Sequence, residues 1–182
     1  MKAIECIRGR RSIREYTDQD ISNETLRQII ETASYAPSWK NTQTVSYIAI
    51  KNQDVKNSIA QNGVLGFTPN MHRVTECNTL IAVITKKGIC GYNTDGTPTT
   101  SKGAHWQSFD AGIATQTLCL AAYTQNVGSV ILGIYDEKRV AEILGINLDT
   151  SEVAALVALG YTNANPQAPK RKPVDELLTV IE

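Results

Sequence analysis

Four arginines and a serine stand within residues 8–14, RGRRSIR, and these residues are well suited to hold a charged ligand. Guanidinium groups form forked, charge-assisted hydrogen bonds with phosphate oxygens, and a serine hydroxyl adds another donor. The segment could therefore surround a phosphate. Two other interpretations stay open on the residues alone, because the arginines could be solvated or could complement the C-terminal dipole of a preceding helix. A nucleic-acid interface is disfavoured, since no aromatic residues alternate with the arginines.

A second group of polar and flat side chains lies at residues 35–44, YAPSWKNTQT, where a helix should end and a strand has not begun. Side-chain amides offer donors and acceptors to the polar edge of a planar heterocycle, a hydroxyl adds a donor, and tryptophan and proline present flat apolar surfaces. The residues that could act in this way are Pro37, Ser38, Trp39, Asn41 and Gln43. An ordinary polar loop after a helix stop is the alternative.

Motifs for side-chain catalysis and for other phosphate cradles are missing from the sequence. It contains no G-x-G-x-x-G, no G-x-x-x-x-G-K-[ST], no G-x-S-x-G and no H-E-x-x-H. Its four cysteines and two histidines show neither a C-x-x-C nor another ligand spacing, so we expect no metal site. Anion-binding and ring-binding residues with few candidate acids, bases or nucleophiles favour chemistry that a cofactor performs.

Length and charge narrow the class of protein further. A chain of 182 residues fits one domain, for which we expect the range 1–182, with residues 163–182 as an extended C-terminal tail. The formal net charge of zero disfavours a protein that coats nucleic acid or an anionic membrane. No apolar run is long enough to span a bilayer and no secretory signal opens the sequence, so we expect a cytoplasmic location.

Helical and strand patterns alternate along the chain. Ser22 should cap a helix whose apolar residues repeat at i, i+3, i+4 and i+7 until Pro37 stops it. The apolar run at residues 79–85, TLIAVIT, predicts a strand covered on both faces and therefore central in its sheet. Gly128 and Gly145 should end the helices before them. The remaining predicted elements are helices at 3–7, 54–61, 106–126 and 137–144, strands at 45–51, 130–135 and 153–161, a loop at 86–105, and a short helix or strand at 174–181.

Three motifs, in the order in which they occur along the chain, resemble motifs of the nitroreductase family of flavin-dependent NAD(P)H oxidoreductases. Residues 10–14, RRSIR, resemble the family's R-R-S-x-R, residues 36–43, APSWKNTQ, resemble A-P-S-x-x-N-x-Q, and PKRKPVDELL in the tail resembles the R-K-P ending. The resemblance covers the whole chain and includes GSVILGIYD after the long alanine-rich helix. It implies an α+β fold in which helices flank a central mixed, mostly antiparallel sheet. It also implies an intertwined homodimer with FMN at the interface.

The resemblance implies roles for single residues as well. Arg14 would lie near the pyrimidine edge of the isoalloxazine, where a fixed positive charge stabilises the reduced flavin. The neighbouring subunit would contribute the five residues already named within residues 37–43. The phosphate and ribityl groups of FMN would be held by Arg10, Arg11, Ser12 and Arg171. Contacts along the ring would come from Asn70 and from the backbone of Ile131, Leu132 and Gly133.

The implied activity is electron transfer from NADH or NADPH, through bound FMN, to a small electron-poor acceptor such as a nitroaromatic, a quinone or a flavin. A non-redox module that binds a nucleotide or phosphate on the same scaffold is an alternative of another class. Dehalogenation and flavin cleavage are alternatives within flavin chemistry. The sequence departs from many relatives at Thr44 and Val45, where they continue with Pro-Trp. Trp39 would then supply an aromatic wall, or would pack into the dimer interface.

Overall fold

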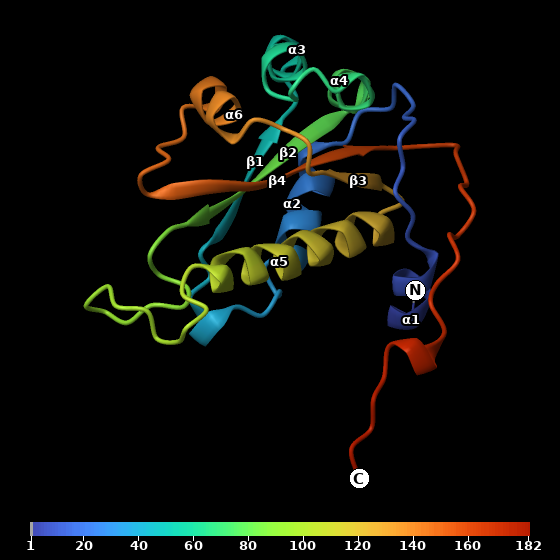
Figure 1. The fold of residues 1–182 in the computed structure, drawn as a ribbon. Helices are drawn as coiled ribbons and strands as arrows, with labels where there is room; N and C mark the ends of the chain where they lie inside the picture. Colours follow the sequence, from blue (N-terminus) through green and yellow to red (C-terminus); the bar gives the residue numbers. More distant parts are fainter. Residues whose placement is uncertain (1) are drawn as a thin grey trace.

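A four-stranded sheet forms the centre of the protein in the computed structural model, which describes residues 2–182 (Figure 1). The strands are β1 (Val45–Ile50), β2 (Thr79–Lys86), β3 (Gly128–Leu132) and β4 (Ser151–Gly160), in the order β1-β2-β4-β3. Neighbouring strands pair antiparallel, and an isolated parallel bridge joins Ser12 to Ser129 in β3. The predictions of a mostly antiparallel sheet and of a central strand at residues 79–85 are confirmed.

Helices cover both faces of this sheet, which confirms the predicted α+β class (Figure 1). α3 (Gln53–Asn62), α4 (Thr68–Glu76) and α6 (Glu137–Leu144) lie over one face, and α2 (Asn23–Ala33) and α5 (His105–Thr124) lie over the other. α1 (Ala3–Gly9) packs beside α5, where the Cys6 thiol donates to the Leu120 carbonyl at 3.5 Å. Two short 3-10 helices complete the fold, at Trp39–Asn41 and Val174–Glu176.

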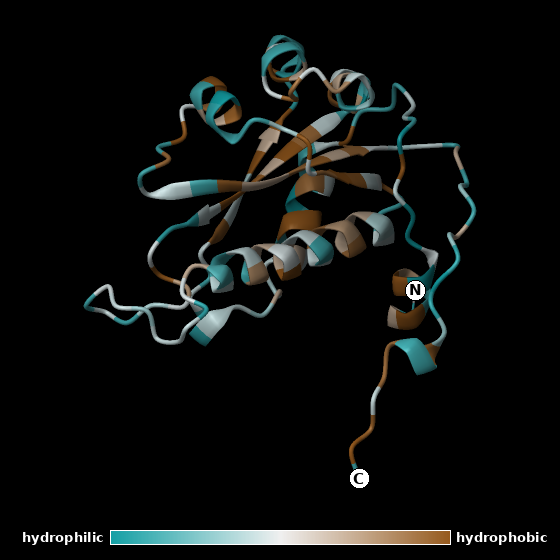
Figure 2. Cartoon of the chain, in the orientation of Figure 1, coloured by the Kyte–Doolittle hydropathy of each residue, from teal (hydrophilic) through white to brown (hydrophobic). Residues whose placement is uncertain are grey.

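Alternate side chains of β2 enter two separate cores. Leu80, Ala82 and Ile84 pack toward α3, α4 and α6, whereas Ile81 and Val83 pack toward α2 and α5. Successive side chains of a strand point to opposite faces, so a strand that is buried on both faces must be apolar throughout. Figure 2 shows that many residues of the strands are apolar.

Local signals set several element boundaries. The Ser22 hydroxyl accepts a hydrogen bond from the Thr25 amide at 3.0 Å, as predicted for the cap of α2. Gly145 ends α6 at a φ of 68°, in the left-handed region that glycine adopts without strain. The prediction that Gly128 ends α5 is wrong. The helix stops at Thr124, Asn126 takes the left-handed conformation at a φ of 59°, and Gly128 begins β3.

The sequence prediction and the structure differ in three further segments. α4 lies in a region for which the sequence predicts no element, because its first turn contains Pro69 and few of its residues are apolar. β3 ends at Leu132 rather than at residue 135, since the chain then turns toward Asp136, the cap of α6. Residues 174–181 form only the 3-10 turn Val174–Glu176, because every side chain there is exposed and none packs on a core.

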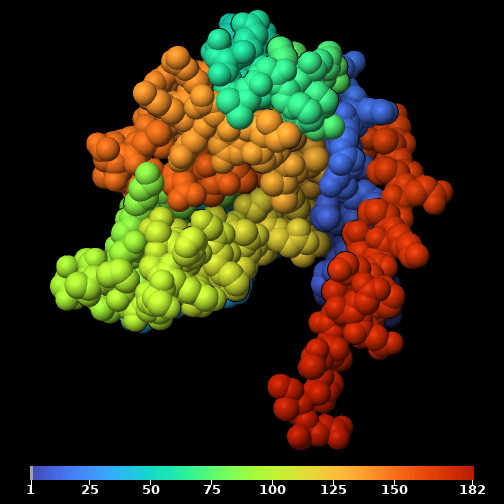
Figure 3. All heavy atoms as spheres, viewed as in Figure 1, coloured from blue at the N-terminus to red at the C-terminus, as the bar shows by residue number. Residues whose placement is uncertain are grey.

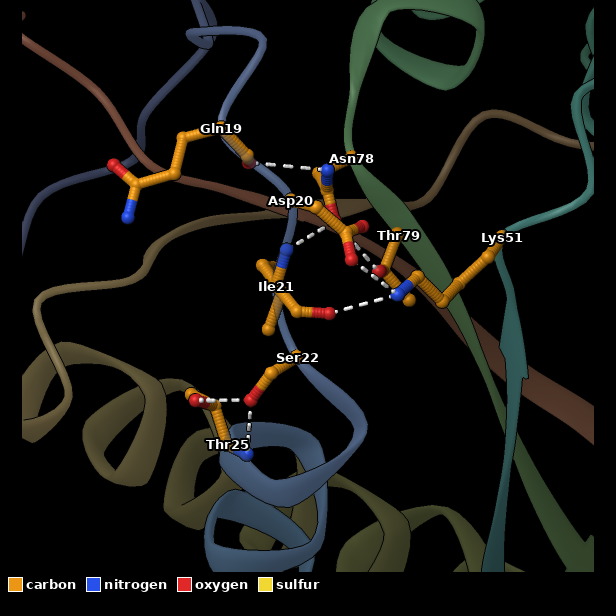
Figure 4. Close-up of polar contacts among 8 residues, drawn as sticks. All are labelled: Gln19, Asp20, Ile21, Ser22, Thr25, Lys51, Asn78 and Thr79. Carbon is orange, nitrogen blue, oxygen red and sulfur yellow. Dashed lines mark hydrogen bonds and ion pairs between the residues drawn. The ribbon is translucent and has the colours of Figure 1, made fainter.

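A cluster of polar contacts fixes the segment that leads into α2 (Figure 4). The Asn78 side chain accepts a hydrogen bond from the Ile21 amide at 2.9 Å and donates to the Gln19 carbonyl at 3.1 Å. Lys51, just after β1, donates to the Ile21 carbonyl at 2.8 Å and to Asp20 Oδ2 at 2.9 Å. Because these bonds satisfy the backbone groups of Ile21, its side chain can be fully buried beneath α2.

Acid should weaken this cluster. The hydrogen bond from Lys51 holds the pKa of Asp20 below its ordinary value. A lowered folded-state pKa contributes stability above the ordinary aspartate pKa of about 4, and that stability is lost as the pH falls through the folded-state value. We therefore expect Asp20→Asn to lower the free energy of unfolding at neutral pH but not in strong acid, as measured by urea denaturation. Asp149→Asn, at an exposed aspartate elsewhere, is the control, and an equal loss at both pH values would contradict the expectation.

Two long segments lie outside the helices and strands. The predicted loop between β2 and α5 is confirmed, and it projects beyond the sheet at one end (Figure 1). The chain after β4 runs beside the N-terminal segment and then away from the rest of the protein (Figure 3). None of the helices within residues 2–182 is both long and apolar enough to cross a membrane. The exposed large apolar side chains of the tail are Val174, Leu177, Leu178, Val180 and Ile181.

Candidate functional site

The arginine segment begins at the C-terminal end of α1, and Arg11 contacts that end directly. Its Nη1 donates to the carbonyls of Arg8 at 2.6 Å, Gly9 at 3.2 Å and Arg10 at 2.9 Å. The last carbonyls of a helix lack partners within the helix, and a cation there complements the helix dipole. Arg11 therefore stabilises α1 and fixes the course of the segment that follows. Its remaining N–H groups are still available to an anion.

Arg10 lies beside a small polar cavity with an unusual pair of polar atoms. Arg10 Nε and Ser129 Oγ are both buried, and neither has a hydrogen-bond partner among the described residues. Both residues line one cavity of about 230 Å³, together with Arg11. The bridge from Ser12 to Ser129 places Ser12 beside the same strand. Arg10 and Arg11 bring positive charge and hydrogen-bond donors to the wall of this cavity, which suits an anionic ligand.

Arg14 and Arg73 both act electrostatically on the phenol of Tyr16. Burial raises the pKa of the Tyr16 phenol, whereas the charges of Arg73 and Arg14 act in the opposite direction. Arg14 is exposed and donates to the Ser12 carbonyl at 3.2 Å. Because both guanidinium groups lie within electrostatic range of one phenol, they form a local concentration of positive charge that could stabilise an anionic group.

Asn70 forms hydrogen bonds with both Arg73 and the chain just after β3. Its side chain is 2% exposed, accepts a hydrogen bond from Arg73 Nη1 at 2.8 Å, and donates to the Ile134 carbonyl at 3.0 Å. Just before Ile134, Gly133 is exposed, and a Cβ built there would meet nothing within 4 Å. The chain therefore has open space beside its backbone at the position where the sequence predicts ring contacts. Leu132 is buried, and Ile131 is 47% exposed.

Residues 37–43 form a tight turn with an unusual backbone. Lys40, Asn41 and Gln43 have φ angles of 46°, 56° and 48°, in the left-handed region that non-glycine residues rarely adopt. The Ser38 hydroxyl accepts a hydrogen bond from the Gln43 amide at 3.1 Å and closes the turn. The Trp39 amide donates to Asp110 Oδ2 at 2.7 Å, and the Trp39 indole nitrogen is buried without a partner within residues 2–182. Local strain of this kind gathers at binding sites.

The turn borders the second cavity of the candidate site. This cavity has a volume of about 330 Å³ and lies between α2, β1 and α5. Its walls are mainly apolar, with a buried carboxylate from Asp110. Three of the five residues predicted in this region line it, namely Pro37, Ser38 and Gln43, whereas Trp39 and Asn41 do not.

The structure thus brings the predicted residues into separate groups within one subunit. Arg10 and Arg11 border the small polar cavity, Asn70 holds the chain just beyond β3, and residues 37–43 border the larger cavity. Arg171 lies in the exposed tail and makes no hydrogen bond or ion pair with the other residues described. Among residues 2–182, no three His, Cys, Asp or Glu side chains gather closely enough to hold a metal ion.

Three residues of these groups were missed by sequence reasoning. Ser129 stands in the apolar run GSVIL, where a lone hydroxyl was a usable signal of a polar contact. Arg73 is a cation three residues after Asn70 on α4, so recognition of that helix would have placed both on one side of it. Asp110 is a carboxylate in an otherwise apolar part of α5 and reaches a turn 71 residues earlier in the chain.

Comparisons with known proteins identify the family of this chain. Residues 7–161 match the model of the nitroreductase family. The chain belongs to the nitroreductase family. Among the relatives is a protein of Archaeoglobus fulgidus assigned as an NADH dehydrogenase/NAD(P)H nitroreductase, which is 30% identical over 88% of this chain and 85% of its own length. The NADPH-flavin oxidoreductase of Vibrio harveyi is 28% identical over 93% of this chain and 70% of its own length.

Solved structures of the nitroreductase family share the fold. A protein of Desulfovibrio desulfuricans assigned as a nitroreductase was solved in complex with FMN. It superposes with a TM-score of 0.79 at 26% identity and covers 98% of this chain and 96% of the other. The nitroreductase-like fold predicted from the three motifs is confirmed by this likeness.

Proposed function

We propose that this nitroreductase-family chain binds FMN and uses it to pass electrons from NADH or NADPH to a small electron-poor acceptor. The observation that carries the proposal is the polar cavity of about 230 Å³ that Arg10 and Arg11 of the RRSIR segment line together with Ser129. Phosphate and ribityl oxygens of FMN are suitable partners for such donors. The FMN complex of the Desulfovibrio desulfuricans relative and the name of the Vibrio harveyi relative support the same cofactor.

The residues of this chain fit FMN in distinct ways. Arg10, Arg11 and Ser12 would hold the phosphate and the ribityl chain, and Arg171 would reach the same phosphate from the tail. Asn70 and the backbone of Ile131, Leu132 and Gly133 would lie along the isoalloxazine ring, with open space beside Gly133. When bound, FMN supplies the chemistry that accepts a hydride and passes electrons on, and the protein supplies position and charge. The nitroaromatics, quinones and flavins named above are acceptors of the proposed class.

Arg14 would set the electronic properties of the bound flavin. It is exposed and donates to one carbonyl only, so its charge remains available to the ring. Because positive charge favours the reduced, anionic flavin, Arg14→Ala should lower the midpoint potential by on the order of 30 mV, which equals about 1.4 kcal/mol for two electrons. The dissociation constant for FMN should change less than it does in Arg171→Ala. Redox titration checks the potential, with Arg14→Lys as the charge-preserving control. A potential that does not move, or equal weakening of FMN binding by both alanine variants, would contradict these roles.

The functional unit would be a homodimer, in which Pro37, Ser38, Trp39, Asn41 and Gln43 contact the flavin of the neighbouring subunit. The tail supports this proposal, because its large apolar side chains stay exposed in one subunit and a second subunit would bury them. Sedimentation equilibrium should give a dimer for the full chain and a shift toward monomer when residues 173–182 are removed. A full-length monomer with bound FMN would contradict it.

We also propose that residues 1–182 form one domain. The cytoplasmic location of the protein stays a prediction from the sequence.

An absorption spectrum during titration with NADH and NADPH tests the central proposal. The purified protein, reconstituted with FMN where necessary, should show flavin absorption bands that bleach when NADH or NADPH is added without oxygen. Protein that cannot be loaded with FMN would contradict the proposal. Bound FMN that neither nucleotide reduces would favour a non-redox binding module. An anaerobic acceptor screen then separates nitro, quinone or flavin reduction from dehalogenation and flavin cleavage.

A further inference from the structure

We infer that Asp110 is a positioning residue that holds the turn at residues 37–43 in shape for the flavin and ties this turn to the loop before α5. The inference rests on the proposed function, since it assigns the turn to flavin binding. Three segments meet at this carboxylate: the turn, the loop between β2 and α5, and α5 itself.

The Asp110 carboxylate is buried and is bound by two donors from other segments. It is 3% exposed, and its Oδ2 accepts the Trp39 amide at 2.7 Å and the Cys90 thiol at 3.0 Å. No lysine or arginine of the described chain forms an ion pair with it. Burial of a carboxylate costs free energy unless hydrogen bonds compensate for the lost contacts with water. The carboxylate of Asp110 therefore requires these two donors, and the donors would be left without a partner if it were removed.

The backbone of the turn requires support from outside. Lys40, Asn41 and Gln43 all have left-handed φ angles, and such conformations persist only where the surroundings hold them. Ser38 closes the turn internally, whereas the bond from Trp39 to Asp110 anchors it to α5. The Trp39 ring also packs on Trp106, one turn before Asp110 on α5, with ring centroids 4.8 Å apart. The turn is therefore fixed to one helix by both a polar and an aromatic contact.

The thiol of Cys90 extends this connection to the loop before α5. Burial and then the hydrogen bond to Asp110 raise the pKa of Cys90 to about 12, so the thiol stays protonated and keeps its role as a donor at neutral pH. Cys90 and Trp39 share the same acceptor oxygen. The turn and the loop are therefore held by one carboxylate on α5.

Amide hydrogen exchange of the flavin-free protein tests the anchor itself. In Asp110→Ala the Trp39 amide should exchange at least about tenfold faster than in the unmodified protein, because it loses a charge-assisted hydrogen bond. Gln107→Ala is the matched control. Gln107 is 4% exposed, lies on the same helix, and accepts the Gly88 amide at 2.8 Å, but it makes no bond to the turn. The control should leave exchange at Trp39 unchanged.

Fluorescence titration with FMN tests the consequence for the site. Asp110→Ala should raise the dissociation constant at least about tenfold, whereas Gln107→Ala should change it less than about threefold. If Asp110→Ala does not fold, Cys90→Ala removes one of the two donors, and it should raise the dissociation constant by a smaller factor that Cys90→Ser restores.

The outcomes separate the inference from the proposed function. An unchanged exchange rate at Trp39 in Asp110→Ala would overturn the inference, as would equal weakening of FMN binding by Gln107→Ala. Faster exchange with unchanged FMN affinity would also overturn it. If Asp110→Ala does not fold, an unchanged FMN affinity in Cys90→Ala would overturn it. Unmodified protein that cannot bind FMN would overturn the proposed function, and the exchange rates would still decide whether Asp110 anchors the turn.

Discussion

Arg10→Ala is expected to raise the dissociation constant for FMN about 100-fold, which corresponds to about 2.7 kcal/mol. Hydrogen bonds to charged groups contribute roughly 1.5–3 kcal/mol each, and Arg10 offers a guanidinium whose Nε has no partner in the described chain. The same feature predicts that the flavin-free protein loses no stability, because the substitution removes a buried donor that the protein leaves unsatisfied. Fluorescence titration with FMN and thermal unfolding of the flavin-free protein measure the two effects.

Arg8→Ala provides the control for this prediction. Arg8 is exposed, lies two residues earlier in the same basic segment, and contributes only its carbonyl to the hydrogen bonds of this region. Its loss therefore reports any general effect of removing one positive charge. Equal FMN affinities in the two variants would contradict a specific role for Arg10. A flavin-free Arg10→Ala protein that unfolds more easily than wild type would indicate that the arginine stabilises the fold instead.

Leu156→Ala is expected to lower the free energy of unfolding by about 3 kcal/mol and the melting temperature by roughly 6–12 °C. Leu156 lies in β4 between Ala82 of β2 and Leu132 of β3 and is completely buried. The substitution leaves a cavity where helices and sheet meet, and the surrounding strands cannot collapse into it without loss of their pairing. Urea denaturation and thermal unfolding measure the loss.

Ile89→Ala tests whether burial is the cause of this effect. Ile89 is 43% exposed in the loop before α5. The loss of its side chain should therefore change the free energy of unfolding by less than about 1 kcal/mol. A comparable loss of stability in both variants would show that burial in the sheet core is not the main cause of the effect of Leu156→Ala on the free energy of unfolding. FMN affinity of folded Leu156→Ala protein should stay near the wild-type value, since Leu156 touches neither cavity of the candidate site.

Local signals predicted most of the fold. The apolar run of β2 allowed its central position to be predicted, and Ser22 and Gly145 marked boundaries that the structure reproduces. α4 escaped prediction because Met71 and Val74 are its main apolar residues and Phe67 supplies no capping side chain. The end of α5 was misplaced because asparagine, rather than glycine, adopts the left-handed turn there.

The candidate site was predictable in its local motifs but not in its long-range contacts. The RRSIR and APSWKNTQ segments each carry their residue types within a few positions, so the sequence alone suggested what they could bind. The anchor from Trp39 to Asp110 spans 71 residues, and no spacing rule encodes such a pair. The left-handed conformations of Lys40 and Gln43 also left no signal, because neither residue type favours them and tertiary contacts impose them.

The strand order β1-β2-β4-β3 has a consequence for synthesis of the chain. β2 ends at Lys86 and its partner β4 begins only at Ser151, so α5 and β3 must emerge from the ribosome between them. Until then, the uncharged run TLIAVIT has one strand edge without its native partner, and such segments pair readily with other chains. The nascent protein should therefore be most prone to aggregation between translation of residue 86 and of residue 160, the interval in which a chaperone would protect it best.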